Sequence, residues 1–218
     1  MRWLWEVHGA KKLDVVVKDR TTLKPRNVTA TREEVDLLMA CSKPSMKLFL
    51  LLCSDLAMRS GTVNKINGSN YDRERREFRF TTKGGSIQML PVTEEIARII
   101  DPLDQTSKVP FVWQLREKEA AQGKRVAWNY GRDVLYKELR EMEKELGFTR
   151  RIIPHDLRRT TAVAMLRETH DLRAVKALLG HDDLKSTLWY IDHDNTPVEL
   201  DTLEKIKRPF IVRKERTA

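Results

Sequence analysis

The segment from Pro44 to Cys53 constrains the fold more than any other part of the chain. Apolar residues fill nearly every position from 46 to 53, with Leu48, Leu50, Leu51 and Leu52 among them. A helix that is apolar on almost every side has no face suited to water, so other elements must surround it. Pro44 suits the first turn of such a helix, where its missing N–H is not needed. The sequence therefore predicts a buried helix with other elements packed around it.

Caps, turns and apolar spacing predict the remaining elements. Thr31 and Glu34 have the spacing of a capping box, which indicates a helix start. Two β-forming runs, 77–82 and 86–91, flank the turn Lys83-Gly84-Gly85 and predict a β-hairpin. We also expect a third strand over 68–72 and helices from 93 and over 128–146, 157–169, 172–179, 184–191 and 198–206, whereas 101–125 carries few signals. The predicted class is α+β, a mainly helical domain with a small antiparallel β-sheet.

The balance of charges favours a polyanionic partner. Lysine and arginine number 41 against 32 aspartates and glutamates, which leaves a net charge of +9 on 218 residues. Nucleic acid is the usual partner of such a chain, although a merely basic protein has the same balance. No run of about 18 apolar residues is present, so no membrane span is predicted. Cys41 and Cys53 lie in apolar helical patterns without metal-binding spacing, which indicates reduced core cysteines and a cytoplasmic protein.

The residues from 154 to 190 carry the strongest chemical signal. His155 and Arg158 are three apart, so on a helix they would share one face. Gly180 ends the apolar run 172–179 and would expose His181 at a bend, and Tyr190 follows nine residues later. A cationic pocket with two imidazoles and a phenol suits attack on a phosphodiester better than on a neutral substrate. Two further cations, Arg59 after the buried helix and Lys83 at the hairpin tip, complete a set of six.

The order and spacing of this set resemble the tyrosine recombinases, the phage-integrase family of DNA breaking and rejoining enzymes. The family's first box matches the residues around Arg59, and its hairpin lysine matches Lys83. Its His-x-x-Arg box matches His155 and Arg158, and its Leu-Gly-His box with the later tyrosine matches the segment 178–190. The resemblance covers about 30–195. One departure is Thr62, which stands where the family usually has an acidic residue.

The resemblance implies a role for each of the six residues. Tyr190 is expected to attack the scissile phosphate and form a 3′-phosphotyrosine link, with Arg59 and Arg158 holding the two non-bridging oxygens. Lys83 would protonate the leaving 5′ oxygen. His155 would assist proton transfer with Tyr190, and His181 would donate a hydrogen bond to the phosphate. The phosphotyrosine link stores the bond energy, so neither a cofactor nor a metal is implied.

The resemblance also predicts domains and partners. Residues 1–28 are interpreted as the tail of an N-terminal core-binding domain plus a linker, or alternatively as a short arm packed on its own domain. Residues 29–218 are the catalytic domain with a C-terminal tail. The expected partners are double-stranded DNA and further copies of the chain, in a tetramer on DNA. DNA-backbone contacts are predicted at four arginines: Arg150, Arg151, Arg159 and Arg76.

Two alternatives keep the DNA and change the chemistry. Residues 172–190 also resemble a helix-turn-helix with Gly180 in the turn, which would bind DNA without cleaving it. A type IB topoisomerase would use the same residues to relax supercoils. Taken singly, Arg59 and Lys83 would be ordinary surface charges, His155 a capping residue and Tyr190 a core aromatic residue. Taken jointly, the six positions favour a site-specific recombinase or integrase.

Overall fold

The computed structural model describes residues 29–82, 84–120 and 132–191. The predictions for 1–28 and 198–206 concern residues outside these ranges. Within them the chain forms helices around one three-stranded sheet, so the predicted α+β class is confirmed. No helix in the described ranges is long and apolar enough to cross a membrane.

Helix α3 (Pro44–Ser54) is the buried helix that the apolar run predicts. Every residue from 48 to 54 is buried, and the helix packs against both α6 (Phe111–Ala120) and α8 (Pro154–Thr169). Helix α2 (Arg32–Cys41) precedes it and begins at the predicted capping box, in which Thr31 Oγ1 accepts a hydrogen bond from the Glu34 backbone N–H. One expectation was wrong: Cys53 is buried, but Cys41 is exposed because it is the last residue of α2.

The sheet has the order β1-β2-β3 and is antiparallel throughout. Strands β2 (Glu77–Thr81) and β3 (Ile87–Pro91) form the predicted hairpin, with Phe78 opposite Leu90. The expected strand over 68–72 is shorter than predicted, because Gly68–Asn70 forms a 3-10 turn capped by Asn67 and only β1 (Tyr71–Asp72) pairs with β2.

The remaining helices follow the predicted order, except for an unpredicted short helix over 60–63 and two further differences. They are α4 (Ser60–Val63), α5 (Glu94–Ile100), α7 (Arg132–Glu145), α9 (Leu172–Leu179) and α10 (Leu184–Ile191). Helix α6 was not predicted, because three consecutive buried residues at its start, Phe111 to Trp113, give no amphipathic period. Helix α8 begins at Pro154 rather than at Leu157, because Pro154 occupies its first turn and the Asp156 carboxylate accepts from the Ile153 N–H.

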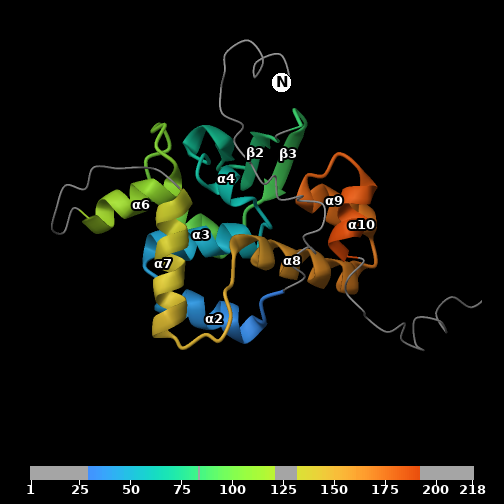
Figure 1. Cartoon of the computed structure of the whole chain (residues 1–218). Coiled ribbons are helices and arrows are strands. Elements are labelled where there is room, and N and C mark those ends of the chain that lie inside the picture. Colours follow the sequence, from blue (N-terminus) through green and yellow to red (C-terminus); the bar gives the residue numbers. More distant parts are fainter. Residues whose placement is uncertain (1–28, 83, 121–131, 192–218) are drawn as a thin grey trace, which may run out of the picture.

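The arrangement places three chain segments around one point. Figure 1 shows α3 in the middle of the molecule, with α9 and α10 together beside β3 and at one end of α8. A small apolar cluster joins this end to the loop after α3, and it consists of Ala57, Ala162, Val175 and Leu179. The loop after α3, helix α8 and the end of α9 therefore meet next to the sheet.

Candidate active site

Arg158 lies at the centre of this meeting point. Its side chain comes from the second turn of α8 and is only 2% exposed. The guanidinium group donates hydrogen bonds to the carbonyl oxygens of Ala57 and Leu179. A planar guanidinium carries several donors in a fixed geometry, so one side chain can bind two carbonyls from separate segments. Arg158 thereby joins the loop after α3 to the end of α9.

The loop after α3 turns sharply at Ala57. This alanine has a φ of 48°, in the left-handed region that non-glycine residues rarely adopt, and it is fully buried. The turn lets the Met58 N–H reach back to the Leu52 carbonyl at 2.9 Å and aims the Ala57 carbonyl at Arg158. Arg59 follows as the exposed N-cap residue of α4. Arg158 thus binds the Ala57 carbonyl, and Arg59 lies two residues further along the same loop. This carbonyl therefore connects the two arginines that are predicted to bind phosphate.

His181 is held next to Arg158 by the end of α9. Gly180 takes the left-handed conformation predicted for it, with a φ of 54°, and the chain then turns toward α10. Nε2 of His181 lies 3.5 Å from a terminal guanidinium nitrogen of Arg158, and Nδ1 lies 3.1 Å from the buried hydroxyl of Thr187 on α10. Burial, and then the charges of Arg158 and Arg59, lower the pKa of His181 to about 4. The imidazole is therefore neutral at pH 7.

His155 lies one turn before Arg158 on α8, as its spacing predicts. Partial desolvation, followed by the charge of Arg158, lowers the pKa of His155 below its usual value, and the charge of Arg59 acts in the same direction. A neutral imidazole has one nitrogen that can accept a proton, which suits a group that takes a proton from a phenol. Arg59, His155, Arg158 and His181 therefore form one electrostatic unit, although they come from three segments.

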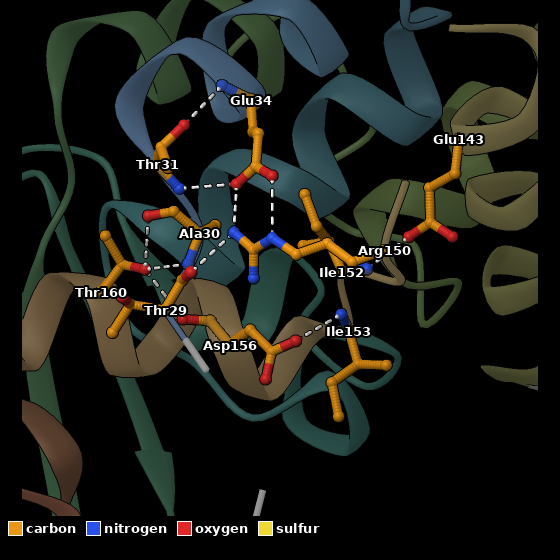
Figure 2. Close-up of polar contacts among 10 residues, drawn as sticks. All are labelled: Thr29, Ala30, Thr31, Glu34, Glu143, Arg150, Ile152, Ile153, Asp156 and Thr160. Atoms are coloured by element: carbon orange, nitrogen blue, oxygen red, sulfur yellow. Dashed lines mark hydrogen bonds and ion pairs between the residues drawn. The ribbon is translucent and has the colours of Figure 1, made fainter. Parts of the chain in front are cut away.

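The N-terminal end of α8 is fixed by a polar network that Figure 2 shows. The Thr160 hydroxyl lies 2.8 Å from the Ala30 backbone nitrogen and 3.1 Å from its carbonyl oxygen. Arg150 forms a two-pronged ion pair with Glu34, and its guanidinium also donates to the Thr29 carbonyl at 2.8 Å. The buried Glu143 of α7 accepts from the Ile152 N–H at 2.7 Å. The helix that carries His155 and Arg158 is thus bound to the start of α2 and to α7.

The other two predicted catalytic residues are less fully described. Lys83 lies outside the described residues, between β2 and Gly84. The backbone of Tyr190 lies in the last turn of α10, and its side chain is not among those described. A cavity of about 610 Å³ lies between the hairpin and α9, and His181 is one of its lining residues. The structure thus brings four of the six predicted residues together and describes the backbone of a fifth, Tyr190.

The structure describes the positions of all four arginines predicted to contact DNA. Arg150 pairs with Glu34 as described, and Arg159 is only 7% exposed. Arg76 is exposed and pairs with Glu94, at the end of β2 opposite to the hairpin turn. Arg151 is exposed next to the start of α8. DNA contact by these arginines stays a prediction.

Sequence reasoning missed Thr187, the buried partner of His181. A threonine six residues after a histidine forms no recognisable motif, and only its full burial on α10 shows its importance. The hydroxyl fixes the direction in which the imidazole ring points, because the ring nitrogen that faces Thr187 cannot also face Arg158. Thr187 therefore orients His181 toward the guanidinium group.

Comparison with known proteins identifies this arrangement. The chain matches the model of the phage integrase family over residues 29–196. Tyrosine recombinase XerD of Lacticaseibacillus casei is 28% identical over 200 residues, which make up 86% of this chain and 66% of that protein. Tyrosine recombinase XerC of Roseiflexus castenholzii (strain DSM 13941 / HLO8) is 29% identical over 157 residues, 69% of this chain and 48% of that protein. The chain thus spans about half to two thirds of the length of these relatives.

Solved structures share the fold. A crystal structure of XerA recombinase aligns with a TM-score of 0.59 at 19% identity, over 85% of this chain and 65% of the other. XerH site-specific recombinase, bound to difH substrate in a pre-cleavage complex, aligns with a TM-score of 0.60 at 18% identity, over 85% and 55% of the two chains. At these identities the likeness shows a shared fold.

Proposed function

Because this chain belongs to the phage integrase family, we propose that it is a site-specific DNA recombinase or integrase. It would cleave and rejoin DNA through a 3′-phosphotyrosine intermediate. The observation that carries the proposal is the position of Arg158, which binds the Ala57 and Leu179 carbonyls. Those bonds bring the segments of Arg59, His155 and His181 to one guanidinium group. A helix-turn-helix that only bound DNA would not need this junction.

The proposed reaction uses a phenol, a neutral imidazole and three cationic side chains. The Tyr190 oxygen attacks the phosphorus, and the P–O5′ bond breaks as the P–O(Tyr) bond forms. His155, held neutral by its surroundings, accepts the phenolic proton, while Lys83 gives a proton to the leaving 5′ oxygen. Arg59 and Arg158 bind the two non-bridging oxygens, where negative charge accumulates in the transition state. Rejoining reverses these steps, so no nucleotide is consumed.

The proposed substrate is double-stranded DNA. The net charge of +9 supports it, as does the difH substrate bound by the related XerH recombinase. Each phosphate that the protein neutralises releases counterions, so log affinity should fall by about 0.9 per log unit of salt for every such contact. Because the cations listed above take the place of a metal in this proposal, cleavage should continue in EDTA.

The direct test is a nicked DNA of the cognate site, which traps the covalent intermediate because the cleaved end diffuses away. The wild-type chain should give an adduct that survives denaturation in a gel. Tyr190→Phe removes only the phenolic oxygen, so it should abolish the adduct and leave DNA binding nearly unchanged. An adduct formed by the phenylalanine variant would show that another residue is the nucleophile. Binding without any adduct from the wild type would favour the helix-turn-helix alternative.

We also propose that the chain assembles as a tetramer on DNA through its C-terminal tail. Exposed apolar residues support a surface for association, since Ile87, Met89 and Leu184 line the cavity beside α9 and are 62%, 53% and 45% exposed. Deletion of residues 195–218 should leave cleavage of a single site measurable and stop strand exchange between paired sites. Full exchange by the truncated chain would exclude a role of the tail in assembly.

A further inference from the structure

Gln88 joins the β-hairpin to the end of α9. It is 7% exposed on the inner face of β3, and its Nε2 donates to the carbonyl oxygens of Ala177 and Leu178 at 3.1 and 2.7 Å. Carbonyls in the last turn of a helix have no N–H one turn further on, so they need partners from elsewhere. Gln88 supplies a donor to both carbonyls, and the Gly180 N–H also donates to the Ala177 carbonyl at 3.1 Å. The hairpin is thereby bonded to the turn that presents His181.

The tip of the hairpin touches the same turn at a second place. The Ser86 hydroxyl donates to the Asp182 carboxylate at 3.2 Å, and it lies 2.7 Å from the Thr82 hydroxyl across the hairpin. Gly84 approaches Asp182 so closely that a Cβ on it would lie 2.2 Å from Oδ2 of the carboxylate. The tip can therefore rest on Asp182 in this way only because residue 84 has no side chain.

Gly180 lies on the α9 side of this contact between the hairpin and the turn that presents His181. Its left-handed φ of 54° already favours glycine, and a Cβ there would lie 2.3 Å from Oε1 of Gln88. A side chain at residue 84 or 180 would thus displace Asp182 or Gln88 from the position it has in this contact. Two polar side chains, Gln88 and Asp182, supply the bonds between the hairpin and the turn. Together with Gly84 and Gly180, these residues define the hairpin contact.

We propose that Gln88 and Asp182 are positioning residues for the proton that Lys83 delivers. Lys83 precedes Gly84 in the chain and His181 precedes Asp182, so the hairpin contact fixes the neighbours of both residues to each other. This inference rests on the proposed function. In the step concerned, the P–O5′ bond breaks, the ammonium proton passes to the 5′ oxygen, and the lysine is left neutral beside a 5′-hydroxyl end.

A substrate with a different leaving group distinguishes a role in proton delivery from a general role in stabilising the fold. When sulfur replaces the bridging 5′ oxygen of the scissile phosphate, the leaving group is a thiolate. A thiol has a pKa of about 8.5, so it departs without a proton from an acid. A variant that fails only in proton delivery should therefore recover full activity on the sulfur substrate, whereas a variant that fails to bind the phosphate should not.

The experiment measures cleavage of nicked oxygen and sulfur substrates by five variants of the full chain. Gln88→Met keeps the shape of the side chain and removes both hydrogen bonds, and Asp182→Ala removes the acceptor for Ser86. Each should cleave the oxygen substrate about 10- to 100-fold more slowly, part of the 10²–10⁴-fold that a general acid contributes. Each should cleave the sulfur substrate at the wild-type rate. Lys83→Ala removes the proton donor itself, so it gives the largest rate loss expected on the oxygen substrate. Arg158→Lys changes a phosphate contact and should be slow on both substrates.

Equal losses on both substrates, or no loss on either, would overturn the proposal. Ser86→Ala changes an exposed residue and carries the same expectation as Asp182→Ala, so the result does not depend on whether Gln88→Met folds. Failure of the underlying function looks different, because the wild-type chain would then form no adduct with either substrate.

Discussion

The two sides of the candidate site are held in different ways. On the α8 side, Arg158 is buried and bonded to two carbonyls, and the start of the helix is bound to α2 and α7 through Thr160, Arg150 and Glu143. On the hairpin side, the described bonds to the His181 turn come from only two side chains, Gln88 and Ser86. The α8 side of the site, with the buried Arg158, thus belongs to the core, and the hairpin side is supported at the edge of the core.

This difference follows from the two kinds of task. Stabilising transition-state charge requires donors fixed before the reaction begins, because reorganising them would cost energy at the moment of cleavage. Delivering a proton to a leaving group requires an acid that reaches the bridging oxygen as the bond breaks. A core helix suits the first task and a surface hairpin the second. Three experiments on stability and rate sharpen the comparison.

The largest expected effect separates the two arginines. Arg158→Ala and Arg59→Ala should each slow cleavage by at least ~10²-fold, the usual cost of losing one transition-state donor. Only Arg158→Ala should also destabilise the fold, by about 3 kcal/mol, since it leaves the buried Ala57 and Leu179 carbonyls without their donor. The exposed Arg59 should change stability by less than about 0.5 kcal/mol. Denaturant unfolding beside adduct assays measures both quantities. Equal stability of the two variants would contradict a structural role for the Arg158 hydrogen bonds.

A smaller effect is expected at the start of α8. Glu34→Gln weakens the ion pair with Arg150, whose two side chains are 22% and 34% exposed. Solvent screening reduces the value of such a pair, so we expect a loss of about 1 kcal/mol in the free energy of unfolding and little change in cleavage rate. Asp36→Asn is the matched control on the same helix, because its pair with Arg32 is largely exposed and should contribute almost nothing. A loss of cleavage without a loss of stability would place Glu34 in the chemistry instead.

The smallest effect concerns pH. The pKa of His181 falls from the ordinary value of 6.5 to about 4 in the fold. On acidification the unfolded chain therefore takes up a proton before the folded chain does, and stability is lost as the pH falls from about 6.5 to about 4. His155 contributes in the same direction. His181→Asn should flatten the decline of Tm over this window, whereas replacement of the exposed His170 should not. An unchanged slope would show that His181 is not held neutral.

Local signals in the sequence predicted most of the elements. The capping box at Thr31, the Gly180 helix end and the hairpin turn each depend on neighbouring residues, and all three are confirmed. Helix α6 was missed because its consecutive buried residues pack on α3 and give no period along the chain. The start of α8 was predicted three residues too late, because Pro154 was not interpreted as a proline in the first turn of a helix.

The site was predictable as a set of residues and not as a set of contacts. Motif spacing named Arg59, His155, Arg158 and His181, and the structure brings these four together. Motif spacing could not identify Gln88 or Thr187, whose hydrogen-bond partners lie on other elements. Likewise, the sequence gives no sign that Arg150 pairs with Glu34, which lies 116 residues away in the chain. Long-range pairing of polar groups leaves no local signal.

The turn at Ala57 limits how such a site can be turned on and off. Its carbonyl holds Arg158, and Arg59 follows two residues later, so the two guanidinium groups share one backbone support. A change of state that separated them would have to break a buried hydrogen bond at a backbone conformation already unfavourable for alanine. Active and inactive forms of the domain should therefore keep this pair of arginines intact. They should differ instead in the hairpin or in α10.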